Sequence, residues 1–324
     1  MDEYEVIKKI FRPLALNEDL SLNLDDDAAI LPNKKQIIVG TDSIVEGDHF
    51  QKNEKNPLLI AKKLLRVNLS DLASMGADPF GYTLNLSLPK KLNKKELITW
   101  IKLFAKGLKQ DQFKYSVKLL GGDTIISNGP LILTITLFGY KNKKIIKRSG
   151  AKLKDDIYIT GNIGDSGIGY KILKKKLNLN KSLNKFYIKK HKLPNPPVEF
   201  GKKLVFFANA STDISDGLLA DLNNILLSSK CGAVIFSRNI PFTKETEKLI
   251  CLKKINIDYL FSCGEDYQLI FTAKKTNSKK IFSFAKKNLI KITKIGNIIK
   301  KKKLIVLDKK NKELSFENLG FKHF

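Results

Sequence analysis

Apolar residues predict β-strands in four places within the first 140 residues. The apolar run at 36–39 is typical of a buried strand, and the alternation at 82–88 predicts a half-buried one. The segments 117–120 and 131–140 predict two more strands. We expect the glycine-rich segment between these two to form a turn.

Two segments between these strands have helical periodicity. After Pro57, leucine and alanine recur at steps of three and four residues, and Gly76 marks the end of the pattern. Asn93 and Glu96 form the pair expected at the start of a second helix. This part of the chain therefore predicts a mixture of strands and helices.

The same mixture restarts after about residue 150. We expect a strand at 157–160, a turn at 161–164 and a helix from about Ser166. Residues 174–192 are rich in Lys, Asn and Leu and are interpreted as a variable excursion, whereas the three prolines in 193–198 mark a loop. Strands and helices then alternate again through Asp213, Ala233, Tyr267 and Leu304.

The restart indicates two mixed α/β domains. The chain has 324 residues, which is large for one core and suits two domains of roughly 150 residues each. We expect these domains to be 1–150 and 151–324. Hydrophobic residues make up 43% of the chain and charged residues 28%, as in folded globular proteins.

The sequence predicts a cytoplasmic protein without a membrane partner. No segment approaches the roughly 20 apolar residues that span a bilayer. The acidic start, Met1-Asp2-Glu3-Tyr4-Glu5, lacks the pattern of a signal peptide. The three cysteines, Cys231, Cys251 and Cys263, form no Cys-x-x-Cys pair, so we expect ordinary reduced thiols.

The net charge of +27 raises the question of nucleic-acid binding. Proteins that read nucleic acids rely on arginine for bidentate contacts, yet the only arginines are Arg12, Arg66, Arg148 and Arg238. The lysines are scattered among Asn and Ile, which favours a compositional bias on solvated surfaces. We therefore expect no nucleic-acid partner, although a positive field would attract anionic substrates.

Acidic residues gather in five clusters beside small residues, at expected strand or helix ends. The clusters are Asp25-Asp26-Asp27, Thr41-Asp42, Asn68-Leu69-Ser70-Asp71, Gly121-Gly122-Asp123-Thr124 and Asp213-Ile214-Ser215-Asp216-Gly217. Carboxylates held close together repel one another unless a cation lies between them. Mg²⁺ takes one or two carboxylates together with phosphate oxygens and water, so dispersed aspartates fit several Mg²⁺ ions on a polyphosphate.

Each cluster also has a purely structural alternative. Asp213 or Ser215 would cap a helix that begins near Asp216. Asp71 would lie on the polar face of its helix, and Asp123 would be a turn residue after two glycines.

Glycine-rich segments offer further places for phosphate. No Gly-x-x-x-x-Gly-Lys-Ser/Thr sequence occurs, which excludes a P-loop enzyme, and protein-kinase signatures are absent. Gly121 and Gly122 would let main-chain amides approach a phosphate. The segment 161–166 would do the same at a helix N-terminus, or would be a plain strand-to-helix turn.

Eight motifs occur in an order that is far more specific than any one of them. They are Asp26-Asp27-Ala28-Ala29, Thr41-Asp42 through Glu46-Gly47-Asp48-His49-Phe50, Asn68-Leu69-Ser70-Asp71-Leu72-Ala73 with Met75-Gly76-Ala77, Gly121-Gly122-Asp123-Thr124, Arg148-Ser149-Gly150-Ala151, Thr160-Gly161 with Gly164-Asp165-Ser166, Asp213-Ile214-Ser215-Asp216-Gly217-Leu218 and Gly264-Glu265-Asp266-Tyr267. From about residue 25 to Phe324 the series resembles the thiamine-monophosphate kinases, of the superfamily that includes aminoimidazole ribonucleotide synthetase and selenophosphate synthetase.

The resemblance implies a two-domain α/β (mixed α+β) fold of the aminoimidazole ribonucleotide synthetase-like superfamily. The N-terminal domain would bind ATP and Mg²⁺, and its sheet would pair with that of a second subunit in a homodimer. The implied reaction converts ATP and thiamine monophosphate into ADP and thiamine diphosphate, with several Mg²⁺ ions as cofactors.

The resemblance also implies roles for residues at matching motif positions. The metal ligands would be Asp27, Thr41, Asp42, Asp71, Asp123, Asp213 and Asp216. The ATP contacts would be Gly122, Asp123, Arg148 and Ser215. The thiamine phosphate contacts would be His49, Glu265 and Phe321.

Four positions depart from the family pattern without deleting a carboxylate. Asp25 stands where Gly is common, and Gly40 stands where Ser often donates to a metal. Cys263 replaces a common Gly, and Phe321 replaces Trp or Tyr, which keeps a stacking face but removes the polar group.

No general base is expected, because the acceptor phosphate is already an anion. Two unit charges about 4 Å apart repel by about 4 kcal/mol at an effective dielectric near 20, so the difficulty is electrostatic. A site rich in Asp and poor in His fits metal-assisted in-line transfer. Arg148 would grip ATP phosphates bidentately or be a surface residue, and His49 would contact substrate or be structural.

Three other functions compete with this interpretation. A selenophosphate synthetase would carry a reactive Cys in an N-terminal glycine-rich loop, and no Cys precedes Cys231. A basic nucleic-acid-binding protein would bind with strong salt dependence and would not need the aspartates. A degenerate scaffold would not be expected to keep the carboxylates.

Overall fold

The computed structural model of the protein describes residues 3–15, 24, 31, 36–52, 54–90 and 93–321. The chain forms two compact units. Unit 1 comprises Met1–Leu72 and Ala77–Lys141, and unit 2 comprises Ala73–Gly76 and Asn142–Phe324. Among the described residues, no helix has both the length and the apolar character needed to cross a membrane.

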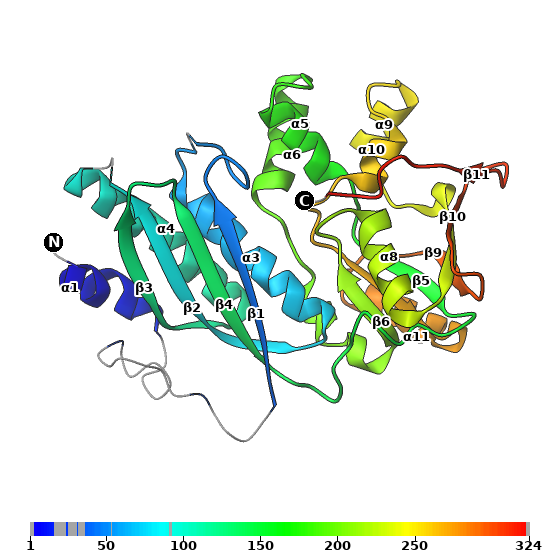
Figure 1. Ribbon diagram of the computed structural model, residues 1–324, viewed down its shortest axis with the longest axis horizontal. Helices are drawn as coiled ribbons and strands as arrows, with labels where there is room; N and C mark the ends of the chain where they lie inside the picture. The colour runs from blue at the N-terminus through cyan, green and yellow to red at the C-terminus, as the bar shows by residue number, and fades with distance from the viewer. Residues whose placement is uncertain are drawn as a thin grey trace. The chain divides into compact units, whose positions relative to one another are not determined.

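Unit 1 is built on a four-stranded sheet in the order β1-β4-β2-β3 (Figure 1). Its strands are β1 (Ile37–Val45), β2 (Asp78–Pro89), β3 (Lys118–Ser127) and β4 (Ile132–Tyr140). β4 is antiparallel to both β1 and β2, whereas β3 is parallel to β2. The order places β1 and β3 at opposite edges.

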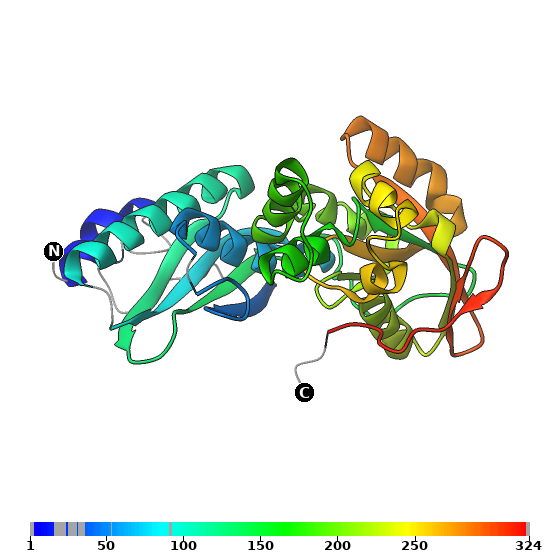
Figure 2. The same cartoon turned by 90° about the horizontal axis from the view of Figure 1, so that it is seen from above.

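Helices cover one face of this sheet (Figure 2). The long ones are α3 (Pro57–Ser74) and α4 (Lys94–Tyr115), and short turns α1 (Glu3–Val6), η1 (Ile7–Phe11) and η2 (Arg12–Leu14) precede them. α4 begins with the predicted capping pair: the side chain of Asn93 accepts the N–H of Glu96, and the Glu96 side chain accepts the N–H of Asn93. α3 is an almost fully buried helix, with Leu64 and Leu69 completely inaccessible.

The other face of the sheet has no covering helix among the described residues (Figures 1 and 2). Its strands alternate between buried residues toward the helices and more exposed residues away from them. Large apolar side chains remain exposed on this face, namely Val39, Ile125 and Ile132.

One local expectation was wrong. Gly121 and Gly122 form no turn but lie inside β3, opposite Thr83 and Leu84 of β2. A Cβ on Gly122 would lie 1.9 Å from the carbonyl oxygen of Leu84, so the glycine is required by the neighbouring strand.

Unit 2 contains a seven-stranded mixed sheet in the order β11-β10-β7-β9-β5-β8-β6. Its strands are β5 (Asp156–Thr160), β6 (Ala208–Asp213), β7 (Gly232–Phe236), β8 (Leu269–Ala273), β9 (Ile292–Ile299), β10 (Leu304–Leu307) and β11 (Glu313–Leu314). Its helices are α5 (Asp165–Leu173), α6 (Lys181–Lys192), α7 (Val198–Gly201), α8 (Leu218–Ser229), α9 (Lys244–Cys251), α10 (Ile257–Ser262) and α11 (Ser278–Lys287). Shorter turns are η4 (Leu204–Phe206), η5 (Ser237–Asn239) and η6 (Lys275–Asn277).

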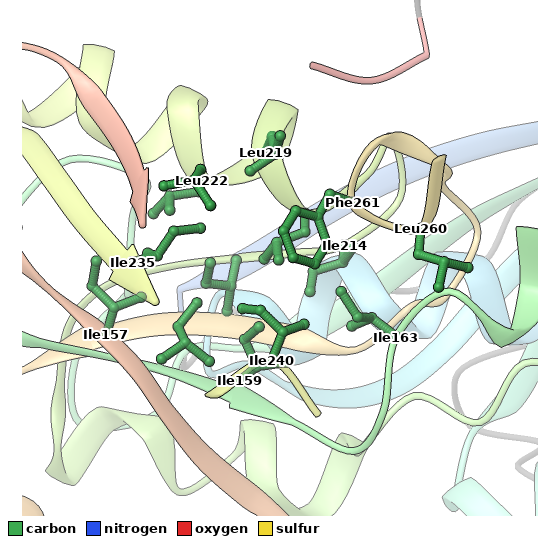
Figure 3. Packing of buried hydrophobic residues seen from close by; sticks show 14 of the residues in the cluster. Ile157, Ile159, Ile163, Ile214, Leu219, Leu222, Ile235, Ile240, Leu260 and Phe261 are labelled. Atoms are coloured by element: carbon green, nitrogen blue, oxygen red, sulfur yellow. The ribbon is translucent and has the colours of Figure 1, made fainter. Parts of the chain in front are cut away.

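Helices lie on both faces of this sheet, with α8 and α11 on opposite sides (Figures 1 and 2). Successive residues of a strand point to opposite faces, and β5 follows this rule. Ile157 and Ile159 join the core that includes α8, whereas the ring of Tyr158 meets Phe282 of α11. Figure 3 shows the α8 side of the core, where Leu219 and Leu222 of α8 and Ile235 of β7 belong to one hydrophobic cluster.

The second part of the Lys-rich segment 174–192 forms α6, which packs against α5. Tyr187 is completely buried, and its hydroxyl lies 3.1 Å from that of Thr246. A Cβ on Gly169 of α5 would lie 2.2 Å from the carbonyl oxygen of Tyr187, so the two helices approach too closely for any larger residue there. All three cysteines are free, with Cys263 buried and Cys251 exposed.

Candidate active site

In unit 1, Asp42 and Asp71 are held near each other by contacts between β1 and α3. The N–H of Asp42 donates to Oδ1 of Asn68 (2.9 Å), and Asn68 is buried. Asp71 follows Asn68 by three residues, so both lie on the same side of α3. The Cβ of Asp71 lies 3.9 Å from the position a Cβ on Gly40 would take. Asp71 is half-buried and faces β1. It does not simply lie on the polar face of its helix, which was the structural alternative for this residue.

The other predicted ligands of unit 1 lie elsewhere. Thr41 alternates with Asp42 along β1, and its hydroxyl donates to the carbonyl of Ile135 (3.1 Å). Asp123 lies on β3 at the opposite edge, in register with Ser43 through β2 and β4. Three strand spacings separate these edges, or about 14 Å. Asp27 lies outside the described residues.

His49 closes the turn that follows β1. Its Nδ1 accepts the N–H of Val45 (3.2 Å), and its carbonyl accepts Nζ of Lys63 (2.8 Å). Since Nδ1 accepts, a neutral His49 ring carries its hydrogen on Nε2. The residue thus has a structural role in this turn.

In unit 2, Asp213 and Asp216 flank the loop that leads from β6 into α8. Asp213 is the last residue of β6 and is buried. Neither Asp213 nor Ser215 caps α8, because the helix begins at Leu218 without a side-chain cap from Gly217. The capping alternative for these residues is therefore wrong.

Asp221, which was not predicted from the sequence, holds this loop instead. Its Oδ2 accepts the N–H groups of Asp216 (3.0 Å) and Gly217 (3.1 Å). Burial, reinforced by the charges of Asp213 and Asp216, raises the pKa of Asp221 to about 8. Asp213 and Asp216 therefore place negative charge around Asp221 at the start of α8, and a cation would relieve it. The Asp-x-x-x-x-Asp spacing from Asp216 was the available signal.

Two further segments meet this loop through main-chain hydrogen bonds. The N–H of Glu265 donates to the carbonyl of Ser215 (2.7 Å), and the N–H of Phe321 donates to that of Asp216 (2.9 Å). A Cβ on Gly264 would lie 2.0 Å from the Ser215 oxygen, so only glycine allows this approach. The structure thus joins both segments to the loop that contains Ser215 and Asp216. Phe321 is 61% exposed.

Glu265 has a left-handed backbone, with φ of 65°. Tyr267 also has a positive φ, 50°, and its N–H donates to the carbonyl of Ile214 (2.9 Å). Such conformations cost about 1–3 kcal/mol each and often occur at functional sites. Here the pairing with residues 214–215 holds the segment in place.

Arg148 lies beside the same strand end. Its Nε is 3.3 Å from the hydroxyl of Thr212, the neighbour of Asp213 in β6. Its carbonyl accepts the hydroxyl of Ser229 (3.2 Å), which also accepts the N–H of Gly150 (3.1 Å). The position of Arg148 is therefore fixed on both sides.

The segment 161–166 is a strand-to-helix turn, and a carboxyl group of the protein binds its main-chain N–H groups. Asp266 accepts the N–H groups of Gly164 (2.6 Å) and Ser166 (3.3 Å) at the start of α5. Burial raises the pKa of Asp266 to about 8. The carboxylate occupies the place that a phosphate would take, so this turn is not a phosphate site.

The described residues contain no group of three or more His, Cys, Asp or Glu side chains that could hold a metal ion unaided. Magnesium needs only one or two carboxylates when phosphate oxygens and water complete its shell. The pair Asp42 and Asp71, and the pair Asp213 and Asp216, offer such hard oxygen donors. Their chemistry fits Mg²⁺ bound together with a nucleotide.

The chain matches two domain families. Residues 25–140 match the AIR synthase related protein, N-terminal domain, and residues 154–309 match the AIR synthase related protein, C-terminal domain. These matches confirm the predicted mixed α/β fold with N- and C-terminal domains.

Individual proteins are similar over the full length. The thiamine-monophosphate kinase of Buchnera aphidicola (subspecies Schizaphis graminum) is 40% identical over 332 residues, covering 100% of this chain and 99% of the relative. The crystal structure of thiamine-monophosphate kinase from Stenotrophomonas maltophilia K279a is 32% identical with a TM-score of 0.83, covering 94% of this chain and 96% of that one. A structure described as AaThiL complexed with AMPPCP and TMP is 27% identical with a TM-score of 0.78, covering 99% of this chain and 97% of that one. The chain is therefore a member of the thiamine-monophosphate kinase family.

Proposed function

We propose that the protein transfers a phosphoryl group from ATP to thiamine monophosphate, giving ADP and thiamine diphosphate. The observation that carries this proposal is the full-length similarity to thiamine-monophosphate kinases. A relative described with AMPPCP and TMP bound supports ATP and thiamine monophosphate as the substrate pair.

The nucleotide contacts are assigned to Gly122, Asp123, Arg148 and Ser215. Arg148 is one of few arginines in a lysine-rich chain, and its planar guanidinium matches two phosphate oxygens at once. Its anchoring beside β6 supports this role, because a fixed side chain loses less entropy on binding.

The thiamine phosphate contacts are assigned to His49, Glu265 and Phe321. The exposed ring of Phe321 offers a stacking face for an aromatic heterocycle. Glu265 is suited to accept hydrogen bonds from the amino group of a pyrimidine. The joining of both segments to the loop of Ser215 and Asp216 supports a common site.

The metal ligands are assigned to Asp27, Thr41, Asp42, Asp71, Asp123, Asp213 and Asp216. Bound Mg²⁺ supplies positive charge that lowers the repulsion between two phosphate compounds. The ligand role of Asp42 and Asp71 is supported by the contacts that bring β1 and α3 together. Several ions are expected, because the carboxylates occur in separate groups.

The chain's own task in the transfer is positioning and charge compensation. The acceptor phosphate is an anion and needs no proton removed, so no residue is assigned as a general base. Arg148 would hold ATP phosphates in line with the acceptor, and Glu265 and Phe321 would orient the thiamine moiety. Transfer in line between the bound phosphates follows from this arrangement.

We also assign ATP and Mg²⁺ binding and dimerisation to the domain 1–150, with 151–324 as a C-terminal α/β domain. Dimerisation through the N-terminal sheet is supported by the helix-free face, on which Val39, Ile125 and Ile132 are exposed. A cytoplasmic location is expected for an enzyme that uses ATP and an anionic cofactor precursor.

A substrate panel tests the proposed reaction. The protein is incubated with ATP labelled in the γ-phosphate and, separately, thiamine, thiamine monophosphate or selenide. Label in thiamine diphosphate, with one ADP formed per product, is expected from thiamine monophosphate alone. Turnover of selenide, or tight salt-dependent binding to nucleic acid without turnover of thiamine monophosphate, would contradict the proposal.

A further inference from the structure

His191 of α6 makes a contact that the proposed reaction does not yet explain. Its Nδ1 lies 3.0 Å from Oε2 of Glu265, to which we assign a thiamine contact. The side chain of His191 is 7% exposed, whereas that of Glu265 is 25% exposed. The histidine is thus the buried partner of a carboxylate that still reaches solvent.

The hydrogen of this contact belongs to the histidine. An ionised carboxylate only accepts hydrogen bonds, so Nδ1 of His191 carries the hydrogen and donates it in the hydrogen bond to Glu265. The hydroxyl of Ser166 also lies near Nδ1, at 3.2 Å, on the side of α5. The ring is further flanked by that of Tyr170, with 5.7 Å between ring centroids.

The fold directs His191 inward from an otherwise basic turn. The last turn of α6 contains Lys189, Lys190, His191 and Lys192. His191 follows Tyr187 by four residues, so both lie on the buried face of the helix. The close approach of α6 to Gly169 then sets how far His191 reaches toward Glu265.

Glu265 is therefore held from two sides. Its main chain is fixed by the bond to the carbonyl of Ser215, in the left-handed conformation described above. Its carboxylate is fixed by His191. A long flexible side chain would otherwise have to lose rotamer freedom when a ligand binds.

We propose that His191 is a positioning residue, which holds the carboxylate of Glu265 in the orientation that accepts thiamine monophosphate. The proposal deepens the proposed function and rests on it. It also explains why the Lys-rich segment 174–192 contains α6, since this helix places His191 beside Glu265.

The test compares four single variants and one double variant by steady-state kinetics. His191→Phe keeps a ring but removes the donor, and His191→Asn restores an amide donor near the place of Nδ1. Glu265→Gln replaces the charged carboxylate that accepts from His191 with a neutral amide. Tyr187→Phe is the matched control, since it removes a buried hydroxyl bond from the same helix without touching Glu265.

We expect His191→Phe to raise the KM for thiamine monophosphate about tenfold or more, the size of losing a hydrogen bond to a charged group. The kcat and the KM for ATP should change by no more than about threefold, because the chemistry and the nucleotide contacts remain. His191→Asn should recover most of the lost affinity. Tyr187→Phe should leave the KM for thiamine monophosphate within about twofold, even where its melting temperature falls.

The double variant separates positioning from loosened packing. If His191 acts through Glu265, combining His191→Phe with Glu265→Gln should cost no more than Glu265→Gln alone. An unchanged KM in His191→Phe, or losses that multiply in the double variant, would overturn the positioning role while the reaction stands. Failure of the wild-type protein to phosphorylate thiamine monophosphate would instead overturn the proposed function and this inference with it.

Discussion

The carboxylate of Asp221 accepts the main-chain N–H of Asp216 at 3.0 Å, and the same oxygen accepts that of Gly217. These bonds fix the loop between β6 and α8. Asp221→Ala should lower the free energy of unfolding by about 2 kcal/mol, because one buried and one partly buried N–H group lose their acceptor. Asp221→Asn should cost less, since its amide oxygen still accepts the two N–H groups. Denaturant unfolding curves measure both, and equal losses would show that the hydrogen bonds do not hold the loop.

Substitution of the β1–α3 carboxylates tests the proposed metal ligands. Asp42→Asn or Asp71→Asn should reduce kcat about a hundredfold or more and raise the Mg²⁺ concentration needed for half-maximal rate. Asp258→Asn, which makes the same chemical change at an exposed position in α10, should leave both values near those of the wild type. Circular dichroism checks that the fold is intact. Near-normal turnover in both site variants would remove these residues from the metal site.

The two adjacent glycines of β3, Gly121 and Gly122, should differ in how much an alanine at each position destabilises the protein. A Cβ at Gly122 would lie 1.9 Å from the Leu84 carbonyl oxygen, whereas a Cβ at Gly121 would meet no atom within 4 Å. Gly122→Ala should therefore destabilise the protein by about 3 kcal/mol or prevent folding, while Gly121→Ala should change stability by less than about 1 kcal/mol. Melting temperatures of the two variants make the comparison. Equal melting temperatures would show that β2 and β3 are not paired in this register.

The buried carboxyl of Asp266 should make stability depend on pH. Its pKa is raised to about 8 by burial, whereas an Asp in an unfolded chain titrates near 3.9. Between these values the folded protein keeps a proton that the unfolded chain has lost, so the free energy of unfolding falls as pH rises, by up to about 1.4 kcal/mol per pH unit. Asp266→Asn lacks this equilibrium. Its melting temperature should therefore fall less than that of the wild type between about pH 5.5 and about pH 7.5, and identical slopes would contradict the assignment.

Features that depend on near neighbours in sequence were predictable. The cap of α4 needs only Asn93 and Glu96, which bond each other's main chain within one turn. The end of α3 needs only Gly76, whose φ of 74° suits a helix terminus. The ordered motifs carried the identification of the family, because they span almost the whole chain.

Features that depend on distant neighbours were missed or misjudged. The glycine at 122 was interpreted as a turn residue because the reason for it, the carbonyl of Leu84, lies on another strand. Asp221 and His191 look like ordinary helix residues in the sequence, and only the folded chain shows which groups they contact. The roles of Asp27, Thr41 and the other proposed ligands stay predictions.

The measurement that tests the central claim most directly is the formation of thiamine diphosphate from ATP and thiamine monophosphate as free Mg²⁺ is varied. The account predicts no product in excess EDTA, full recovery when Mg²⁺ is restored, and a rate that rises with Mg²⁺ beyond the concentration that saturates ATP, since protein carboxylates hold further ions. Thiamine diphosphate formation that persists in excess EDTA would contradict it.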